Sequence, residues 1–252
     1  MAQLTIVADK VAMSDAAAER ITNAIELAVS TRGSAAVSLT GGDTPDLLYA
    51  SLADGGRPWR SRIDWHRLHV FWGDERAVPP HHPESNYGLA HRLLLQHVDV
   101  PLRHIHRMRG ELPATDAGAL YDDELHAHQH LHAGPLFDVM LLGIGSNAHI
   151  ASLFPGSSLL THAETSGRLA AGVFVPELNR WRITMTPRAL LDARRIIMIA
   201  SGPSKAAAIT AAIEQPVDVA RYPAQLLREA GDAVEWIIDA AAAARLRAAP
   251  PA

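Results

Sequence analysis

The 252-residue sequence contains no cysteine. This absence excludes disulfide bonds, thiolate metal sites and a cysteine nucleophile. The sequence also lacks an apolar run of the roughly 20 residues needed to cross a bilayer, and its first residues do not place a basic segment before an apolar one. We therefore expect a cytoplasmic protein that does not attach to membranes.

Lysine is scarce, since only Lys10 and Lys205 occur among 23 basic residues and the others are arginine. The formal net charge of -4 gives no overall attraction to nucleic acid or to an anionic membrane. Any anion must therefore be bound by a local group of cations, and we expect a small-molecule partner. The hydrophobic fraction of 48% is typical of a globular protein with a sizeable core.

Predicted strands and helices alternate along the chain. Short apolar or β-branched runs predict strands at 3–8, 35–39, 68–72, 137–142, 169–175, 182–185, 195–200 and 234–238. Helical spacing predicts a first helix from an N-cap at Ser14 to a stop near Gly33. Further helices are predicted after a cap at Thr44, after a cap at Ser85 or Asn86, and at 116–132, 203–214 and 239–247.

Strands that alternate with helices imply a mostly parallel sheet flanked by helices on both faces, which is a Rossmann-like α/β fold. No internal repeat or low-complexity linker divides the sequence, so we expect residues 1–252 to form a single domain. Ligands of such sheets bind beyond the carboxyl ends of the strands. Four polar segments that contain glycine follow predicted strands, and they are the candidate site.

The first of these segments is Thr40-Gly41-Gly42-Asp43-Thr44-Pro45. Its glycines, Gly41 and Gly42, allow a ligand to approach the backbone closely, and the following helix start offers unpaired N–H groups. The pattern therefore favours a phosphate site, although an ordinary strand-to-helix turn has the same form. Asp43 would oppose a phosphate unless its side chain points away or binds sugar hydroxyls.

Two further segments place charges at strand ends. Asp74 and Arg76 lie two residues apart in Gly73-Asp74-Glu75-Arg76, so in an extended segment they face the same side. Such a pair can accept from a hydroxyl and donate to a phosphate, but it is also the composition of a solvated ion cluster. Lys205 lies where a helix dipole opposes a cation, which favours an anion partner over a simple surface position.

His149, in the segment 143–156, is the candidate for acid–base chemistry, because a histidine exchanges protons near neutral pH. A structural or exposed histidine is the alternative, since the chain has 14 of them. His126 and His130 have the i, i+4 spacing of a metal-binding pair, but we expect neither a metal nor another cofactor. His104 and His106 are predicted to lie in surface loops.

Taken together, these segments resemble the 6-phosphogluconolactonase family, within the wider glucosamine-6-phosphate isomerase/deaminase-like fold. The matching motifs occur in the family's order and span nearly the whole chain: TGGDTP at 40–45, WGDERAVP at 72–79, SNY at 85–87, GIGSNAHIASLFPG at 143–156, RIT at 182–184, GPSK at 202–205 and the segment 236–239. The resemblance implies that His149 is the general base and that Asp74 and Arg76 line the substrate site. It assigns the phosphate to the TGGDTP loop (Gly41, Gly42, Asp43, Thr44) with Arg182 and Lys205.

The sequence departs from the family beside the histidine, where Asn147, Ala148 and Ile150 replace the usual Asp, Gly and Thr. Asn147 can form a hydrogen bond with His149, but it cannot stabilise an imidazolium by charge. In a serine-protease triad the comparable change costs about 10⁴ in turnover. Ala148 would be strained by roughly 1 kcal/mol or more if its backbone is left-handed.

The resemblance implies hydrolysis of 6-phosphoglucono-δ-lactone to 6-phosphogluconate, the second step of the oxidative pentose phosphate pathway. Two alternatives remain: an isomerase or deaminase that acts on glucosamine 6-phosphate, and a non-catalytic sugar-phosphate-binding paralogue that Asn147 and Ala148 would favour. The expected partner is a small sugar-phosphate lactone, with no nucleic acid. A monomer or a small homo-oligomer is expected.

Overall fold

Six strands form the centre of the computed structural model, which describes residues 2–131, 134–161 and 165–247, and all of them except the edge strand β1 are largely buried. The strands pair in the order β1-β9-β8-β5-β2-β3, and every pairing is parallel. Their bounds are β1 Gln3–Val7, β2 Ala35–Leu39, β3 Leu68–Trp72, β5 Phe137–Gly143, β8 Ala193–Ala200 and β9 Val234–Asp239. The predicted parallel α/β sheet is therefore confirmed.

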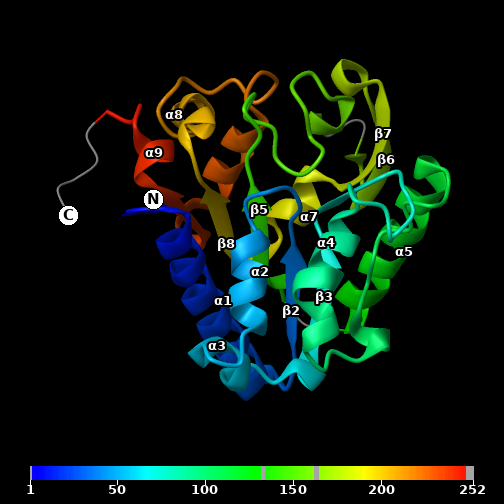
Figure 1. Ribbon diagram of the computed structural model, residues 1–252. Helices are drawn as coiled ribbons and strands as arrows, with labels where there is room; N and C mark the ends of the chain where they lie inside the picture. The colour runs from blue at the N-terminus through cyan, green and yellow to red at the C-terminus, as the bar shows by residue number, and fades with distance from the viewer. Residues whose placement is uncertain (1, 132–133, 162–164, 248–252) are drawn as a thin grey trace.

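Helices cover both faces of this sheet, as predicted (Figure 1). Side chains alternate along β5, so that Val139 and Leu141 face one apolar cluster while Met140 and Leu142 face the other. The first cluster contains α1 Lys10–Arg32, α2 Asp46–Ala53, α3 Pro58–Arg62 and α4 Asn86–Leu93. The second contains α5 Ala114–Leu131, α7 Pro187–Leu191, α8 Ala206–Ile213, α9 Ala240–Ala243 and the 3₁₀ segment η7 Pro223–Ala233.

Shorter 3₁₀ turns connect these elements. They are η1 Trp65–Arg67, η2 Leu95–His97, η3 Leu102–His104, η4 Ser158–Leu160, η5 Pro176–Leu178 and η6 Pro203–Lys205. Among the helices within the described ranges, none combines the length and the apolar character needed to span a membrane.

A second, antiparallel sheet contains β4 Asp74–Arg76, β7 Arg180–Met185 and β6 Ala170–Val175, in the order β4-β7-β6. The strands predicted at 169–175 and 182–185 exist, but their expected place in the parallel alternation is wrong. The physical reason is the connection between them, because a parallel pair needs a crossover of about a dozen residues. Here the turn at η5 and Asn179 returns the chain at once.

Two predicted helix caps are wrong. Helix α1 begins one turn earlier than expected, because the carboxylate of Asp9 accepts from the backbone N–H of Ala12 at 2.9 Å. Ser14 lies inside the helix, and its hydroxyl donates to the carbonyl of Lys10 at 2.9 Å. Helix α2 begins after Pro45 without a side-chain cap, so Thr44 does not cap it. The predicted stop at Gly33 is confirmed by its left-handed φ of 84°.

The strand order of the parallel sheet reverses between β2 and β5. From β2 the chain continues to β3 on one side, whereas from β5 it continues to β8 and β9 on the other. Ligands of parallel sheets bind where the strand order reverses in this way. The TGGDTP segment follows β2 and the segment with His149 follows β5, so the two adjoin at this point.

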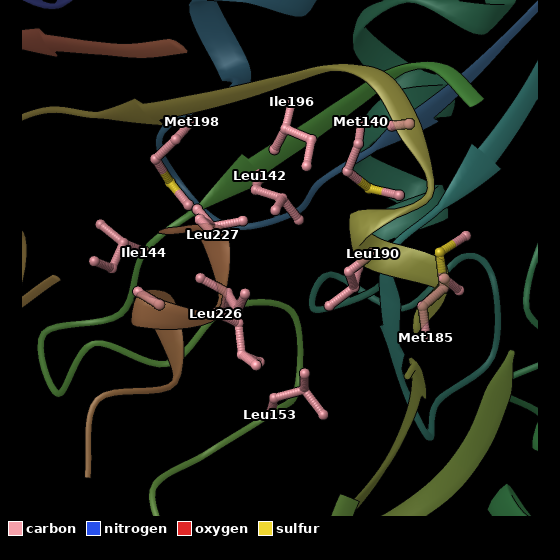
Figure 2. Close-up of a cluster of buried hydrophobic side chains, with 14 of the residues drawn as sticks. Met140, Leu142, Ile144, Leu153, Met185, Leu190, Ile196, Met198, Leu226 and Leu227 are labelled. Atoms are coloured by element: carbon pink, nitrogen blue, oxygen red, sulfur yellow. The ribbon is translucent and has the colours of Figure 1, made fainter. Parts of the chain in front are cut away.

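Apolar side chains anchor the loop that carries His149 at both ends. Figure 2 shows Ile144, before the histidine, and Leu153, after it, beside Leu226 and Leu227 of η7. All four side chains are buried in the cluster beneath β5 and β8. The loop therefore rests on the core of the domain.

We predict that Leu153→Ala lowers the free energy of unfolding by about 2–5 kcal/mol, because it leaves a cavity under the His149 loop. Urea denaturation measures this change. Leu120→Ala on α5 is the matched control, since Leu120 is 45% exposed and its truncation should change stability by no more than about 0.5 kcal/mol. Equal effects of the two substitutions would contradict the anchoring of the loop.

Candidate active site

The loops after β2 and β3 dock through a glycine. A Cβ atom on Gly41 would lie 1.7 Å from the side-chain oxygen of Asn86, at the start of α4, so only glycine fits. The amide nitrogen of Asn86 donates to a carboxylate oxygen of Asp74 at 2.9 Å and to its main-chain carbonyl at 2.8 Å. The first predicted segment is thus tied to the second.

Asp74 also connects to the loop after β5. The hydroxyl of Ser152 donates to its second carboxylate oxygen at 2.6 Å, and the Asp74 side chain is almost fully buried. The backbone N–H of Ser152 donates to the hydroxyl of Thr184 on β7 at 3.2 Å. Hydrogen bonds from the start of α4 and from the loop after β5 therefore fix the orientation of the Asp74 carboxylate.

Glu75 performs a structural task beside this carboxylate. Its oxygens accept from the Ser85 hydroxyl at 2.9 Å and from the backbone N–H groups of Asn86 and Tyr87 at 2.8 and 2.9 Å, at the N-terminus of α4. Burial raises the pKa of the Glu75 carboxyl, and these hydrogen bonds oppose the increase. Glu75 thus fixes the turn that positions Asp74 and Arg76 on β4.

The imidazole of His149 lies between a glycine and an aromatic ring. Its ring stacks on Phe154 at 4.0 Å between centroids, and a Cβ atom on Gly145 would lie 2.1 Å from Nδ1. Nδ1 lies 2.7 Å from the side-chain oxygen of Asn147. The loop is closed by the backbone N–H of Gly145, which donates to the carbonyl of His149 at 2.9 Å.

Ala148 has the left-handed backbone conformation that strains a residue other than glycine, with a φ of 65°. Its side chain is buried in the apolar cluster, and its carbonyl accepts from the N–H of Ala224 at 2.9 Å. An L-residue in this conformation is strained by roughly 1–2 kcal/mol. Burial of the methyl group offsets part of this strain.

Three cations approach the histidine. Arg76 and Arg182 are paired across β4 and β7, and Lys205 lies at the start of α8, beyond the carboxyl end of β8. Arg182 and Lys205 are half-buried, and burial lowers the pKa of both groups. Within the described ranges neither has an ion-pair partner, so an anion would complete the cluster.

The charges of Asp74 and the three cations act on the pKa of His149. It is lowered to about 4, first by burial, while the charge of Asp74 raises it and the charges of Lys205, Arg182 and Arg76 lower it further. The structure therefore brings together the predicted histidine, carboxylate and cations. At neutral pH the imidazole is uncharged, which is the form that accepts a proton.

The TGGDTP segment lies at the same edge of the sheet. The hydroxyl of Tyr49 fixes the main chain of Thr40 through hydrogen bonds of 2.6 and 3.0 Å, and Gly42 has a φ of 85°. Asp43 is exposed, and its charge raises the pKa of Lys205, which places the two near each other. Thr44, the next residue after Asp43, is partly buried.

His104 and His106, predicted to lie in surface loops, lie in a turn and a loop and are partly buried. His104 stacks on His69 at 4.0 Å, and Nδ1 of His106 lies 2.7 Å from a carboxylate oxygen of Glu124. The N–H of His106 donates to the carbonyl of Val70 at 2.8 Å, so this segment covers the edge of β3.

His126 belongs to the pair with metal-binding spacing. Its Nδ1 lies 2.9 Å from the carbonyl of Asp122. The described residues contain no group of three or more His, Cys, Asp or Glu side chains that could hold a metal ion.

The sequence alone did not identify three supporting residues of the site. Glu75 and Ser152 lie inside the quoted motifs, so their positions could have been examined. Glu177, whose carboxylate accepts from the amide nitrogen of Asn147 at 2.9 Å, lies in an exposed turn between β6 and β7. No local pattern distinguishes it from other surface glutamates.

Comparison with known proteins shows the family and the fold. The model of the glucosamine-6-phosphate isomerases/6-phosphogluconolactonase family matches residues 8–236. The chain is 37% identical to a 6-phosphogluconolactonase of Streptomyces coelicolor, over 97% of this chain and 94% of that protein. It is 36% identical to one of Haemophilus influenzae, over 82% and 85% of the two chains. The solved 6-phosphogluconolactonase of Trypanosoma brucei has a TM-score of 0.82 at 29% identity, over 98% of this chain and 99% of that chain.

We predict that Ala148→Gly changes the free energy of unfolding by no more than about 0.5 kcal/mol. Glycine relieves roughly 1–2 kcal/mol of backbone strain. It also loses about 0.8 kcal/mol from burial of the methyl group, and it increases the conformational entropy of the unfolded chain, which lowers stability. Ala17→Gly, at a fully buried position inside α1, is the matched control and should cost about 1.5–2 kcal/mol. Thermal or urea unfolding of both variants measures the difference, and equal losses would show that position 148 is unstrained.

Proposed function

The chain belongs to the glucosamine-6-phosphate isomerase/6-phosphogluconolactonase family, and from this premise we propose that it hydrolyses 6-phosphoglucono-δ-lactone to 6-phosphogluconate. This is a carboxylic ester hydrolysis in the oxidative pentose phosphate pathway. The observation that carries the proposal is an uncharged imidazole within reach of the charges of three cations, in a chain whose curated relatives bear the lactonase name.

In the proposed mechanism His149 is the general base. Its imidazole removes a proton from water while the oxygen attacks the carbonyl carbon C1 of the lactone. The tetrahedral intermediate then breaks its bond to the ring oxygen, which receives the proton from the imidazolium. The products are the C1 carboxylic acid, which releases its proton to solvent and becomes the carboxylate of 6-phosphogluconate, and the free hydroxyl from the ring oxygen. The imidazole is again neutral.

The phosphate is assigned to the cations. Arg76 and Arg182 provide donors that suit phosphate oxygens, and Lys205 adds a compact charge. The backbone of Gly41 and Gly42 can approach the same group, while Asp43 and Thr44 border it. Asp74 is proposed to bind a sugar hydroxyl, because it is held by Ser152 and Asn86 rather than by a cation. Such positioning lowers the entropic part of the barrier.

The two other candidate functions have less support. The curated relatives named here are lactonases rather than glucosamine-6-phosphate deaminases, and no observation favours proton transfer at C2 of an amino sugar. A non-catalytic sugar-phosphate binder would retain the cations but would not need a base. Its signature is binding without hydrolysis.

We predict that His149→Ala lowers kcat for 6-phosphogluconolactone by about 10²–10⁴, the usual contribution of a positioned general base. The measurement is hydrolysis above the spontaneous rate, with binding of 6-phosphogluconate followed in parallel. Binding should persist, because the phosphate contacts remain. Hydrolysis that does not change in this variant would remove His149 from the mechanism, and binding without hydrolysis in the unmodified protein would identify a binder.

We also predict that 6-phosphogluconate raises the pKa of His149 from its value of about 4 in the empty site. The phosphate dianion offsets the cations that lower this pKa, so the protonated imidazole becomes less unfavourable. Imidazole resonances of His149, followed by NMR against pH with and without the ligand, report the midpoint. An increase is expected with bound ligand.

Lys205→Gln provides the control for this titration. Removing one cation should raise the pKa of His149 in the empty site, and the ligand should then produce a smaller further increase. If the pKa of His149 is the same with and without 6-phosphogluconate, the phosphate does not bind beside the histidine.

A further inference from the structure

A chain of two hydrogen bonds runs from the candidate base to an exposed carboxylate. The side-chain oxygen of Asn147 lies 2.7 Å from Nδ1 of His149, and its amide nitrogen donates to a carboxylate oxygen of Glu177 at 2.9 Å. Glu177 is in the turn η5, 30 residues away in the sequence. This arrangement involves the position where the family resemblance predicts aspartate.

The chemistry of the two side chains fixes the direction of these bonds. An ionised carboxylate only accepts hydrogen bonds, whereas an amide has one accepting end and one donating end. Glu177 therefore holds the NH₂ group of Asn147 toward itself and the oxygen toward the ring. The backbone N–H of His149 donates to the same oxygen at 3.3 Å, which favours the same orientation.

The orientation of the amide decides the tautomer of His149. An oxygen facing Nδ1 requires the ring hydrogen on Nδ1, and Nε2 then keeps the lone pair that accepts a proton. A rotated amide would present its NH₂ group to Nδ1 and move the hydrogen to Nε2. The wrong tautomer is the cause of the about 10⁴-fold loss in a serine-protease triad whose aspartate becomes asparagine.

We propose that Glu177 is a positioning residue for His149, which acts through Asn147 to keep Nε2 as the basic nitrogen. Position 147 has no carboxylate, and the carboxylate of Glu177 acts instead, through the amide of Asn147 that lies between it and the imidazole. The structural part of this proposal concerns the tautomer alone. The effect on turnover rests on the proposed function.

The first test uses the imidazole itself. Nitrogen NMR of His149 at pH 7 should show the hydrogen on Nδ1 in the unmodified protein, and a mixture of both tautomers in Glu177→Ala. Glu229→Ala removes the same charge from an exposed site elsewhere and should leave the tautomer unchanged. This readout does not require activity, so it remains decisive if the protein proves not to be a lactonase.

The second test is kinetic. Glu177→Ala should lower kcat by about 10-fold or more with little change in KM, which is part of the about 10⁴-fold loss that the wrong histidine tautomer causes in a serine-protease triad. Glu177→Gln should lose less, because its amide oxygen can still accept from Asn147. Glu229→Ala should retain the full rate.

In an Asn147→Asp background, removal of Glu177 should no longer lower kcat. An aspartate fixes the Nδ1 hydrogen by itself and is repelled by Glu177, so removing Glu177 in that background should leave kcat unchanged or increase it. An equal loss in both backgrounds would overturn the proposal. An Nε2 hydrogen in the unmodified protein, or a tautomer that does not change in Glu177→Ala, would overturn it as well.

Discussion

The interaction on which the site depends is the electrostatic coupling between the cations and the imidazole of His149. Arg76, Arg182 and Lys205 lower the pKa of the histidine in addition to the effect of burial, and Asp74 only partly opposes them. Under the proposed function, the cations assigned to the phosphate thus make the proposed base weaker while the site is empty. A bound phosphate dianion would offset the same charges and raise the pKa of the imidazole again.

The fold supplies this coupling with two kinds of sheet. The parallel sheet brings the loops after β2, β5 and β8 to one edge, where the glycine segments and Lys205 lie. The antiparallel sheet adds the two arginines, because Arg76 on β4 is directly paired with Arg182 on β7. Neither sheet alone contains all three cations.

The parts of the structure that follow from local pattern were predictable. The alternation of apolar strands and helices gave the parallel sheet, and glycine next to polar residues at strand ends marked the loops that converge on His149. The cap of α1 was misplaced because Ser14 and Asp9 both precede apolar spacing, and only the bond from Ala12 distinguishes them. The antiparallel sheet was missed because strand direction depends on the length of the connecting turn rather than on strand composition.

Contacts between residues that are distant in the sequence were beyond prediction. The carboxylate of Glu177 meets Asn147 across 30 residues of sequence, and its own neighbours carry no periodic signal. The docking of Gly41 against Asn86 is similar, since a glycine in a turn does not indicate which side chain will occupy the space beside it. These contacts depend on the relative placement of loops, which the parallel sheet determines only after it has formed.

Asn147 separates two tasks that a single aspartate would combine. An aspartate beside Nδ1 would orient the ring and also raise its pKa, which favours the charged imidazolium in the empty site. The amide orients the ring without adding charge, and burial then keeps the imidazole neutral at pH 7. Under the proposed function, the charge that raises this pKa comes from outside the loop, from a substrate phosphate that would bind the cations and leave with the product. The imidazole would then be the strongest base when a phosphorylated ligand is bound.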